Sequence, residues 1–180
     1  MKNYVNHLAF TAFLKSILTE LDKVKYDAFT DKDGNIRVLQ PYELLKAGRG
    51  TCWDQALYTY AKIKTAASMA EVYMFYIMHY MPSAAKGKQH STHTGVIVKD
   101  PATKKYVWVE HAWEKYKGLH EFNELEDAYT FIKDAHKRSR KDYLVQWNPK
   151  VKVDKLFKAG STLTDNKFLA ICGEGGWTAK

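Results

Sequence analysis

Apolar residues at helical spacing open the chain. Between residues 4 and 26 they recur every three or four positions, which predicts an amphipathic helix. Residues 30–35, TDKDGN, predict a turn, and Pro41 begins a short predicted helix over 41–47 that Gly48 ends. The apolar stripe of the first predicted helix consists of Phe10, Leu14, Ile17, Leu21 and Val24.

Two further segments begin with residues that cap helices. Over residues 51–67, Thr51 and Asp54 form a T-x-x-D pair, in which each side chain can bond the other residue's backbone N–H. Over residues 123–137, Asn123 and Glu126 form a similar pair. The apolar stripe of this second segment is Leu125, Ala128, Ile132 and Ala135. Both segments are therefore predicted helices.

The remaining apolar segments have the composition of strands. Residues 71–80, EVYMFYIMHY, form an unbroken run rich in aromatic and β-branched residues, typical of a central strand. Residues 93–100, 106–113 and 142–147 predict three more strands, the first two joined by a hairpin at PATKK. Residues 148–180 predict irregular structure with a short strand at 167–172. The order of elements predicts a single α+β domain over 1–180, in which an antiparallel sheet carries the helices.

Composition and charge narrow the functional classes. The chain of 180 residues lacks the apolar run of a secretory signal or a membrane-spanning helix, so we expect a cytoplasmic protein without membrane contact. The net charge of +8 and the basic cluster HKRSRK at 136–141 allow a nucleic-acid partner. The other lysines are scattered, which favours a solvated surface instead. The two cysteines, Cys52 and Cys172, are expected to be free thiols.

Cys52 is the first candidate for chemistry. It lies in GRGTCWDQALY, between a glycine-rich loop and the predicted helix that Thr51 caps. The unpaired N–H groups and the dipole at a helix N-terminus favour a negative charge, so a cysteine there tends toward the nucleophilic thiolate. The same N–H groups can stabilise an oxyanion on an attacked carbonyl. Cys172 has no such position.

A base and an orienting acid are predicted on the hairpin. A thiol nucleophile needs a base, and the base needs a group that holds its tautomer. A hairpin centred near residues 102–103 places His93 directly opposite Glu110 on the neighbouring strand. The sequence thus predicts a Cys52–His93–Glu110 triad.

These residues resemble a known family. The pieces GRGTCWDQALY, THTGVIV and YVWVEHAW, followed by KGLHEF, are similar to the transglutaminase-like superfamily of papain-fold cysteine enzymes. The likeness covers residues 40–130, and Glu110 stands where most members carry Asp or Asn. It implies a papain-like fold, with the cysteine-bearing helix packed on an antiparallel sheet. It also implies acyl transfer on protein or peptide amides without a cofactor, with Cys52 as nucleophile, His93 as base and Glu110 as orienting acid.

Other roles follow from the same comparison. No tryptophan precedes Cys52 as it does beside the oxyanion of some transglutaminases, and Gln40 and Tyr42 are candidates to replace it. Trp53 and Trp108 are candidates for core or for the wall of the substrate groove, and Trp108 shares the Glu110 side of its strand.

Several alternatives remain open at this stage. His111 competes with His93 as the base, with Glu121, Glu124 or Asp127 as its acid. The histidines are too dispersed along the chain to predict a metal site. A catalytically silent binding protein on the same fold, or a basic nucleic-acid-binding domain with a structural Cys52, are the two other functional classes. The sequence does not decide the oligomeric state.

Overall fold

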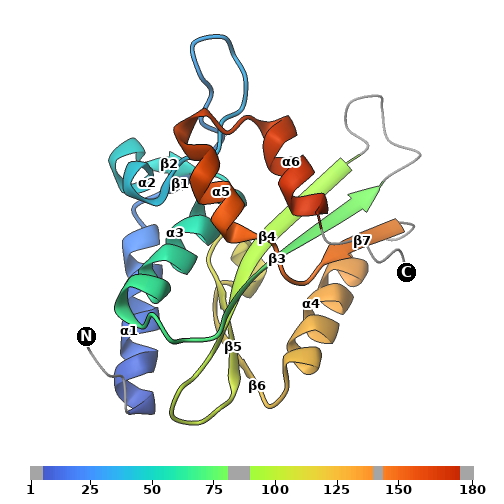
Figure 1. Cartoon of the computed structure of the whole chain (residues 1–180). Helices are drawn as coiled ribbons and strands as arrows, with labels where there is room; N and C mark the ends of the chain where they lie inside the picture. Colours follow the sequence, from blue (N-terminus) through green and yellow to red (C-terminus); the bar gives the residue numbers. More distant parts are fainter. Residues whose placement is uncertain (1–5, 81–89, 140–143, 175–180) are drawn as a thin grey trace.

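A five-stranded antiparallel sheet with helices on both faces forms the framework of the protein (Figure 1). The computed structural model describes residues 6–80, 90–139 and 144–174. The strand order is β6-β5-β4-β3-β7. The strands are β3 (Val72–Tyr80), β4 (His90–Lys99), β5 (Tyr106–Glu110), β6 (Gly118–Phe122) and β7 (Leu144–Asn148).

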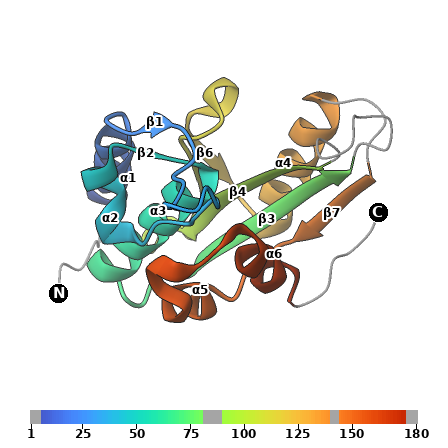
Figure 2. The same ribbon diagram turned by 90° about the horizontal axis from the view of Figure 1, so that it is seen from above.

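The helices divide between the two faces of the sheet, as seen from above in Figure 2. One face packs against α1 (His7–Leu21), α2 (Pro41–Ala47), α3 (Cys52–Ala66), α5 (Val153–Ala159) and α6 (Asp165–Gly173). The opposite face packs against α4 (Leu125–Ser139). The longest described helices have 15 residues, and none of the described helices is long and apolar enough to cross a membrane.

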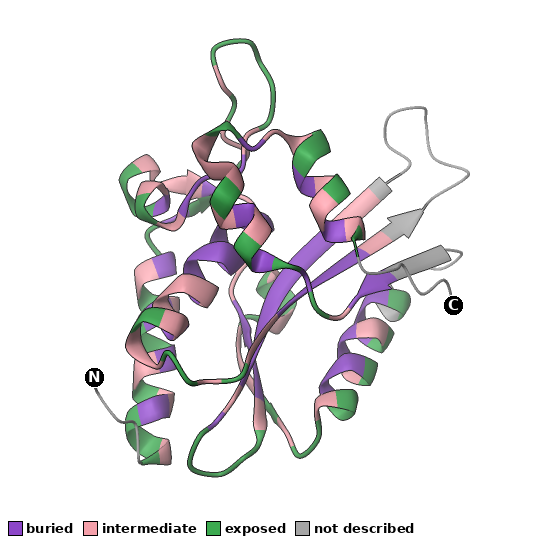
Figure 3. Cartoon of the chain, in the orientation of Figure 1, coloured by how far each residue is buried: buried purple, intermediate pink, exposed green. Residues whose placement is uncertain are grey.

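Strand β3 lies inside the sheet, between β4 and β7, which explains why its sequence is an unbroken apolar run. Met74, Phe75, Tyr76 and Ile77 are all fully buried, because neighbouring strand residues point to opposite faces and both faces are covered. Met74 and Tyr76 belong to the core under α3 and α6, whereas Phe75 and Ile77 belong to the core under α4. The buried residues follow β3 and β4 through the middle of Figure 3.

Two short elements lie beside the start of α3. Strand β1 (Lys25–Tyr26) pairs in parallel with β2 (Arg49–Gly50), with Tyr26 opposite Gly50. Gly48 ends α2 with a φ of 64°, in the left-handed region that glycine adopts without strain. Gly50 is required for space, because a Cβ there would lie 2.5 Å from Leu44 Cδ1. The two glycines of the GRG loop thus meet different steric demands.

The mixed α+β class and most predicted elements are confirmed, with shifted ends. The first helix is shorter than predicted, ending at Leu21, although Val24 is buried as expected. The predicted strand 106–113 ends at Glu110. Strand β6 was not predicted. The predicted strand 142–147 is β7, which begins at Leu144, residues 142–143 lying outside the described part.

The prediction for the C-terminal region was wrong. The described part of this region, up to residue 174, contains α5, the short 3₁₀ helix Gly160–Thr162, and α6. The segment KFLAIC, predicted as a strand, belongs to α6. Phe168 and Cys172 stand four residues apart, so a helix points both side chains into the core, where both are fully buried. The helical spacing of those two residues outweighs the local preference of the apolar run for a strand.

Candidate active site

Cys52 is the first residue of α3, as the capping pair predicts. The Asp54 carboxylate accepts hydrogen bonds from the Thr51 backbone N–H at 2.6 Å and from the Thr51 hydroxyl at 2.8 Å. The helix therefore begins at Cys52, whose side chain lies at the positive end of the helix dipole. The residue is only 3% exposed, so a reacting group must approach the thiol through a narrow opening.

His93 and Glu110 are in direct contact. His93 Nε2 lies 2.8 Å from Glu110 Oε2, and both residues are buried. The other carboxylate oxygen, Oε1, accepts the Trp113 backbone N–H at 2.8 Å. Glu110 is thus held at both oxygens, and one of them orients the imidazole.

The register by which these residues meet differs from the prediction. The pairing of β4 with β5 runs from Val96–Val109 to Lys99–Tyr106, and its continuation places Gly95, not His93, opposite Glu110. His93 lies two residues before Gly95 in β4 and so on the same face of the sheet. The long Glu110 side chain reaches it diagonally. Gly95 leaves room for the ring of Phe75, its partner on β3. A Cβ at Gly95 would lie 2.6 Å from Phe75 Cζ.

The Cys52 thiol lies near enough to the imidazole for its charge to affect the ring. Burial by itself lowers the pKa of His93, but the charge and hydrogen bond of Glu110, together with the effect of Cys52, outweigh it and raise the pKa from 6.5 to about 10. The ring is therefore an imidazolium at neutral pH. A cationic imidazole beside a thiol at a helix N-terminus stabilises the thiolate, the nucleophilic form of cysteine.

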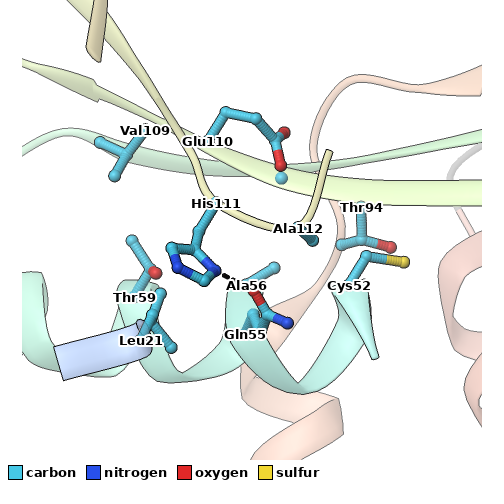
Figure 4. A pocket seen from close by; sticks show the side chains of 11 residues that line it. Leu21, Cys52, Gln55, Ala56, Thr59, Thr94, Val109, Glu110, His111 and Ala112 are labelled. Carbon is cyan, nitrogen blue, oxygen red and sulfur yellow. Dashed lines mark hydrogen bonds between the residues drawn. The ribbon is translucent and has the colours of Figure 1, made fainter. Parts of the chain in front are cut away.

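A small cavity adjoins the thiol (Figure 4). Its walls include Cys52 and Gln55 from α3, Thr94 from β4, and Glu110 and His111 from the end of β5. Figure 4 shows the Glu110 and His111 side chains leaving the backbone in opposite directions. The thiol, Thr94 and the carboxylate thus meet where β5 ends.

His111, the competing base, contacts other groups. Its Nδ1 lies 2.8 Å from Gln55 Oε1, and its Nε2 lies 3.0 Å from Asp22 Oδ1. The Asp22 carboxylate also pairs with Lys117 Nζ at 2.6 Å. The carboxylate partner of His111 is thus Asp22, at the end of α1, and the two ring nitrogens have these two side chains as partners.

Gln40 lies on a segment tied to the first turn of α3. The N–H of the preceding residue, Leu39, donates to Asp54 Oδ1 at 2.5 Å. Gln40 is 6% exposed, and its Nε2 has no hydrogen-bond partner among the described residues. A buried amide donor left unpaired is costly, which makes it a candidate for a substrate oxygen.

The other three candidate substrate residues lie away from the thiol. Tyr42 is 77% exposed and lines a separate groove with Phe13 and Tyr58. The Trp53 ring packs on Phe168 with centroids 4.5 Å apart, on the core side of α3. Trp108 is fully buried on the α4 side of the sheet, behind Gly95, whose added Cβ would lie 3.1 Å from Trp108 Nε1. Tyr42 is therefore a groove residue, and the two tryptophans are core.

Tyr26 is a site residue that the sequence analysis missed. The pairing of β1 with β2 brings it beside Gly50, two residues before Cys52. The charge of Cys52, together with burial, raises the pKa of Tyr26 above its ordinary range, so the hydroxyl stays protonated. No sequence period signals a two-residue strand paired with one so far along the chain.

The remaining thiol and the histidines form no second site in the described ranges. Cys172 is fully buried in α6, and burial raises the pKa of its thiol well above the ordinary range. Within the described residues, no three His, Cys, Asp or Glu side chains are grouped so as to hold a metal ion.

Comparison with known proteins adds no relative to this description. Neither the protein-family models, nor the curated proteins, nor the solved structures include a match to this chain.

Proposed function

We propose that this protein is a cysteine-dependent enzyme that transfers acyl groups from the amide carbonyls of proteins or peptides. The observation that carries this proposal is the buried hydrogen bond between His93 and Glu110 near the Cys52 thiol, which stands at the N-terminus of α3. Each member has the neighbour its role requires: the nucleophile has a base, and the base has an orienting carboxylate.

The geometry supports a two-stage reaction. The Cys52 thiolate attacks the amide carbon, and the carbonyl electrons move to an oxyanion, for which we propose the Cys52 N–H and the Gln40 amide as donors. When the oxyanion collapses, the carbon–nitrogen bond breaks and the imidazolium of His93 gives its proton to the departing amine or ammonia. The resulting thioester is attacked by water or by a second amine, which gives its proton to His93.

The wider assignment rests on the resemblance of residues 40–130. We propose the transglutaminase-like superfamily and a papain-like fold, supported by a cysteine-bearing helix packed on an antiparallel sheet. Protein or peptide amides follow as the substrate class from the same resemblance. We place the protein in the cytoplasm, because a thiol nucleophile must stay reduced.

Thiol labelling tests the nucleophile. Brief treatment of the folded protein with iodoacetamide at about pH 6.5, below the ordinary thiol pKa of about 8.5, should label Cys52 before Cys172. The imidazolium stabilises one thiolate, whereas burial disfavours the other. Peptide mass spectrometry identifies the labelled residue. Equal labelling, or label on Cys172 first, would contradict Cys52 as nucleophile.

Two histidine variants test the base. His93→Ala should abolish the reactivity of Cys52 at about pH 6.5, because the thiolate loses its cationic partner. His111→Ala is the matched control and should leave that reactivity nearly intact, since His111 contacts Gln55 and Asp22 instead. Circular dichroism checks that both variants fold. The opposite pattern of reactivity would assign the base to His111.

A further inference from the structure

The Thr94 hydroxyl is buried at the cavity beside the thiol and has no partner there. Thr94 is 2% exposed, and its Oγ1 makes no hydrogen bond within the described part of the chain. The side chain stands on the same face of β4 as Val96 and Val98, the face that α3 covers. It lines the cavity together with Cys52 (Figure 4). A buried hydroxyl without a partner costs stability, so its place beside a nucleophile points to a ligand oxygen.

Gln55 brings an amide donor to the same cavity. Its Oε1 lies 2.8 Å from His111 Nδ1, which fixes the oxygen end of the amide. Its Nε2 reaches the Gly50 carbonyl at 3.4 Å, a long contact that uses only one of the two N–H groups. Figure 4 shows the amide nitrogen on the side of Gln55 that faces the Cys52 end of the cavity. The His111 contact therefore leaves the nitrogen as a donor to the cavity.

The cavity borders the space that a reacting carbonyl oxygen must occupy. When the Cys52 sulfur bonds to a carbonyl carbon, only that carbon separates the sulfur from the oxygen, so the oxygen lies next to the thiol. A hydroxyl and an amide can both donate to a negative oxygen and keep their protons. The other walls are largely apolar, which strengthens hydrogen bonds to a charged oxygen. These apolar walls include Leu21, Ala56 and Val109.

We propose that this cavity binds the carbonyl oxygen of the substrate, and that the Thr94 hydroxyl and the Gln55 amide donate to the oxyanion in addition to the donors named above. This role rests on the proposed acyl transfer. Thr94 directly follows His93 along β4, so one strand supplies both the base and a catalytic hydroxyl. Because the oxyanion exists only in the intermediate and the transition states beside it, bonds made to it raise the rate of the chemical step.

Two electrophiles separate this role from support of the thiolate. Acylation by p-nitrophenyl acetate passes through an oxyanion, whereas alkylation by iodoacetamide displaces iodide at a saturated carbon and forms none. Thr94→Val should slow the nitrophenolate burst about 100-fold, the scale of losing one oxyanion donor. It should change the iodoacetamide rate by less than about three-fold, because the pair of His93 and Glu110 is untouched. Thr94→Ser keeps the hydroxyl and should retain the burst to within about five-fold.

Thr59→Val is the matched control. Thr59 is 3% exposed and also lines the cavity, but it stands seven residues after Cys52 in α3, about 10 Å along the helix axis. Its burst should equal that of the wild type. Urea unfolding provides an independent measurement, since Thr94→Val removes a hydroxyl that has no partner to lose. The unfolding midpoint of Thr94→Val should therefore stay the same or rise.

The other outcomes overturn the proposal in distinguishable ways. An equal fall of both rates in Thr94→Val would mean that the hydroxyl supports the thiolate, and an unchanged burst would mean that it does not touch the oxyanion. A burst lost equally in Thr94→Ser, or a lower urea midpoint in Thr94→Val, would give Thr94 a structural role. If the wild-type protein alkylates at Cys52 but shows no burst with the ester, acyl transfer itself is wrong.

Discussion

Glu110→Gln should lower turnover by about 10⁴-fold, the loss seen when the acid of a catalytic triad becomes an amide, while the protein still folds. The expected reason is specific to this site. Glu110 Oε1 accepts the Trp113 N–H, so the oxygen of a glutamine takes that place. Its NH₂ group then faces His93 Nε2, which must act as an acceptor. That arrangement favours a neutral imidazole in place of the imidazolium.

The same change should alter the pH dependence of Cys52 alkylation. In the wild type the raised pKa of His93 keeps the ring protonated from about pH 6.5 to pH 8.5, so the cationic partner of the thiol is present throughout that range. In Glu110→Gln the imidazolium is lost at lower pH. The alkylation rate at about pH 6.5 should then fall below that of the wild type, because the thiolate has lost its cationic partner.

The control for Glu110→Gln is Glu121→Gln on the neighbouring strand β6. Glu121 is a partly exposed carboxylate 3.7 Å from Lys105 Nζ, and a pair of this kind contributes about 0–1 kcal/mol. We expect neither its activity nor its alkylation profile to change. If Glu110→Gln also left the profile unchanged in a folded protein, Glu110 would be a structural carboxylate and the triad would be wrong.

Asp54→Ala should destabilise the protein by about 3 kcal/mol. The buried carboxylate accepts the backbone N–H groups of Leu39 and Thr51, so its removal deletes a helix cap and leaves buried donors unpaired. Urea unfolding measures the change as a lower midpoint at constant slope. Because Asp54 also ties the Gln40 segment to α3, the remaining folded fraction should acylate more slowly.

Asp154→Ala is the matched control for the helix cap. Asp154 stands in the first turn of α5 and is exposed, and we expect a change within about 0.5 kcal/mol. Equal destabilisation by the two variants would show that Asp54 acts only through the helix dipole and not through the hydrogen bonds described above.

Much of the site was predictable because its signals are local. The T-x-x-D pair specifies the start of α3 at Cys52, and a hydrogen bond over three residues does not depend on distant parts of the chain. The hairpin at 100–105 brings His93 and Glu110 onto neighbouring strands, since antiparallel strands joined by a short turn pair by necessity. Alternation along β5 also separates Glu110 from His111.

The parts that were missed depend on contacts between distant segments. The exact pairing, with Gly95 opposite Glu110, depends on the geometry of the turn and on Phe75 filling the space at Gly95. The helical form of residues 165–173 depends on the core that receives Phe168 and Cys172. The sequence of an apolar run does not show which surface will cover it. The local preference of residues 167–172 for a strand therefore gave the wrong prediction.

The complete site is a property of the tertiary structure. Local sequence patterns place a cysteine, a histidine and a glutamate on a helix and a hairpin. The packing of α3 on the sheet brings the thiol near the imidazole, and the β1–β2 pairing places Tyr26 beside Gly50. Hydrogen bonding and burial are short-range in space but not in sequence. The chain therefore encodes the elements locally, and only their packing decides which side chains share the thiol.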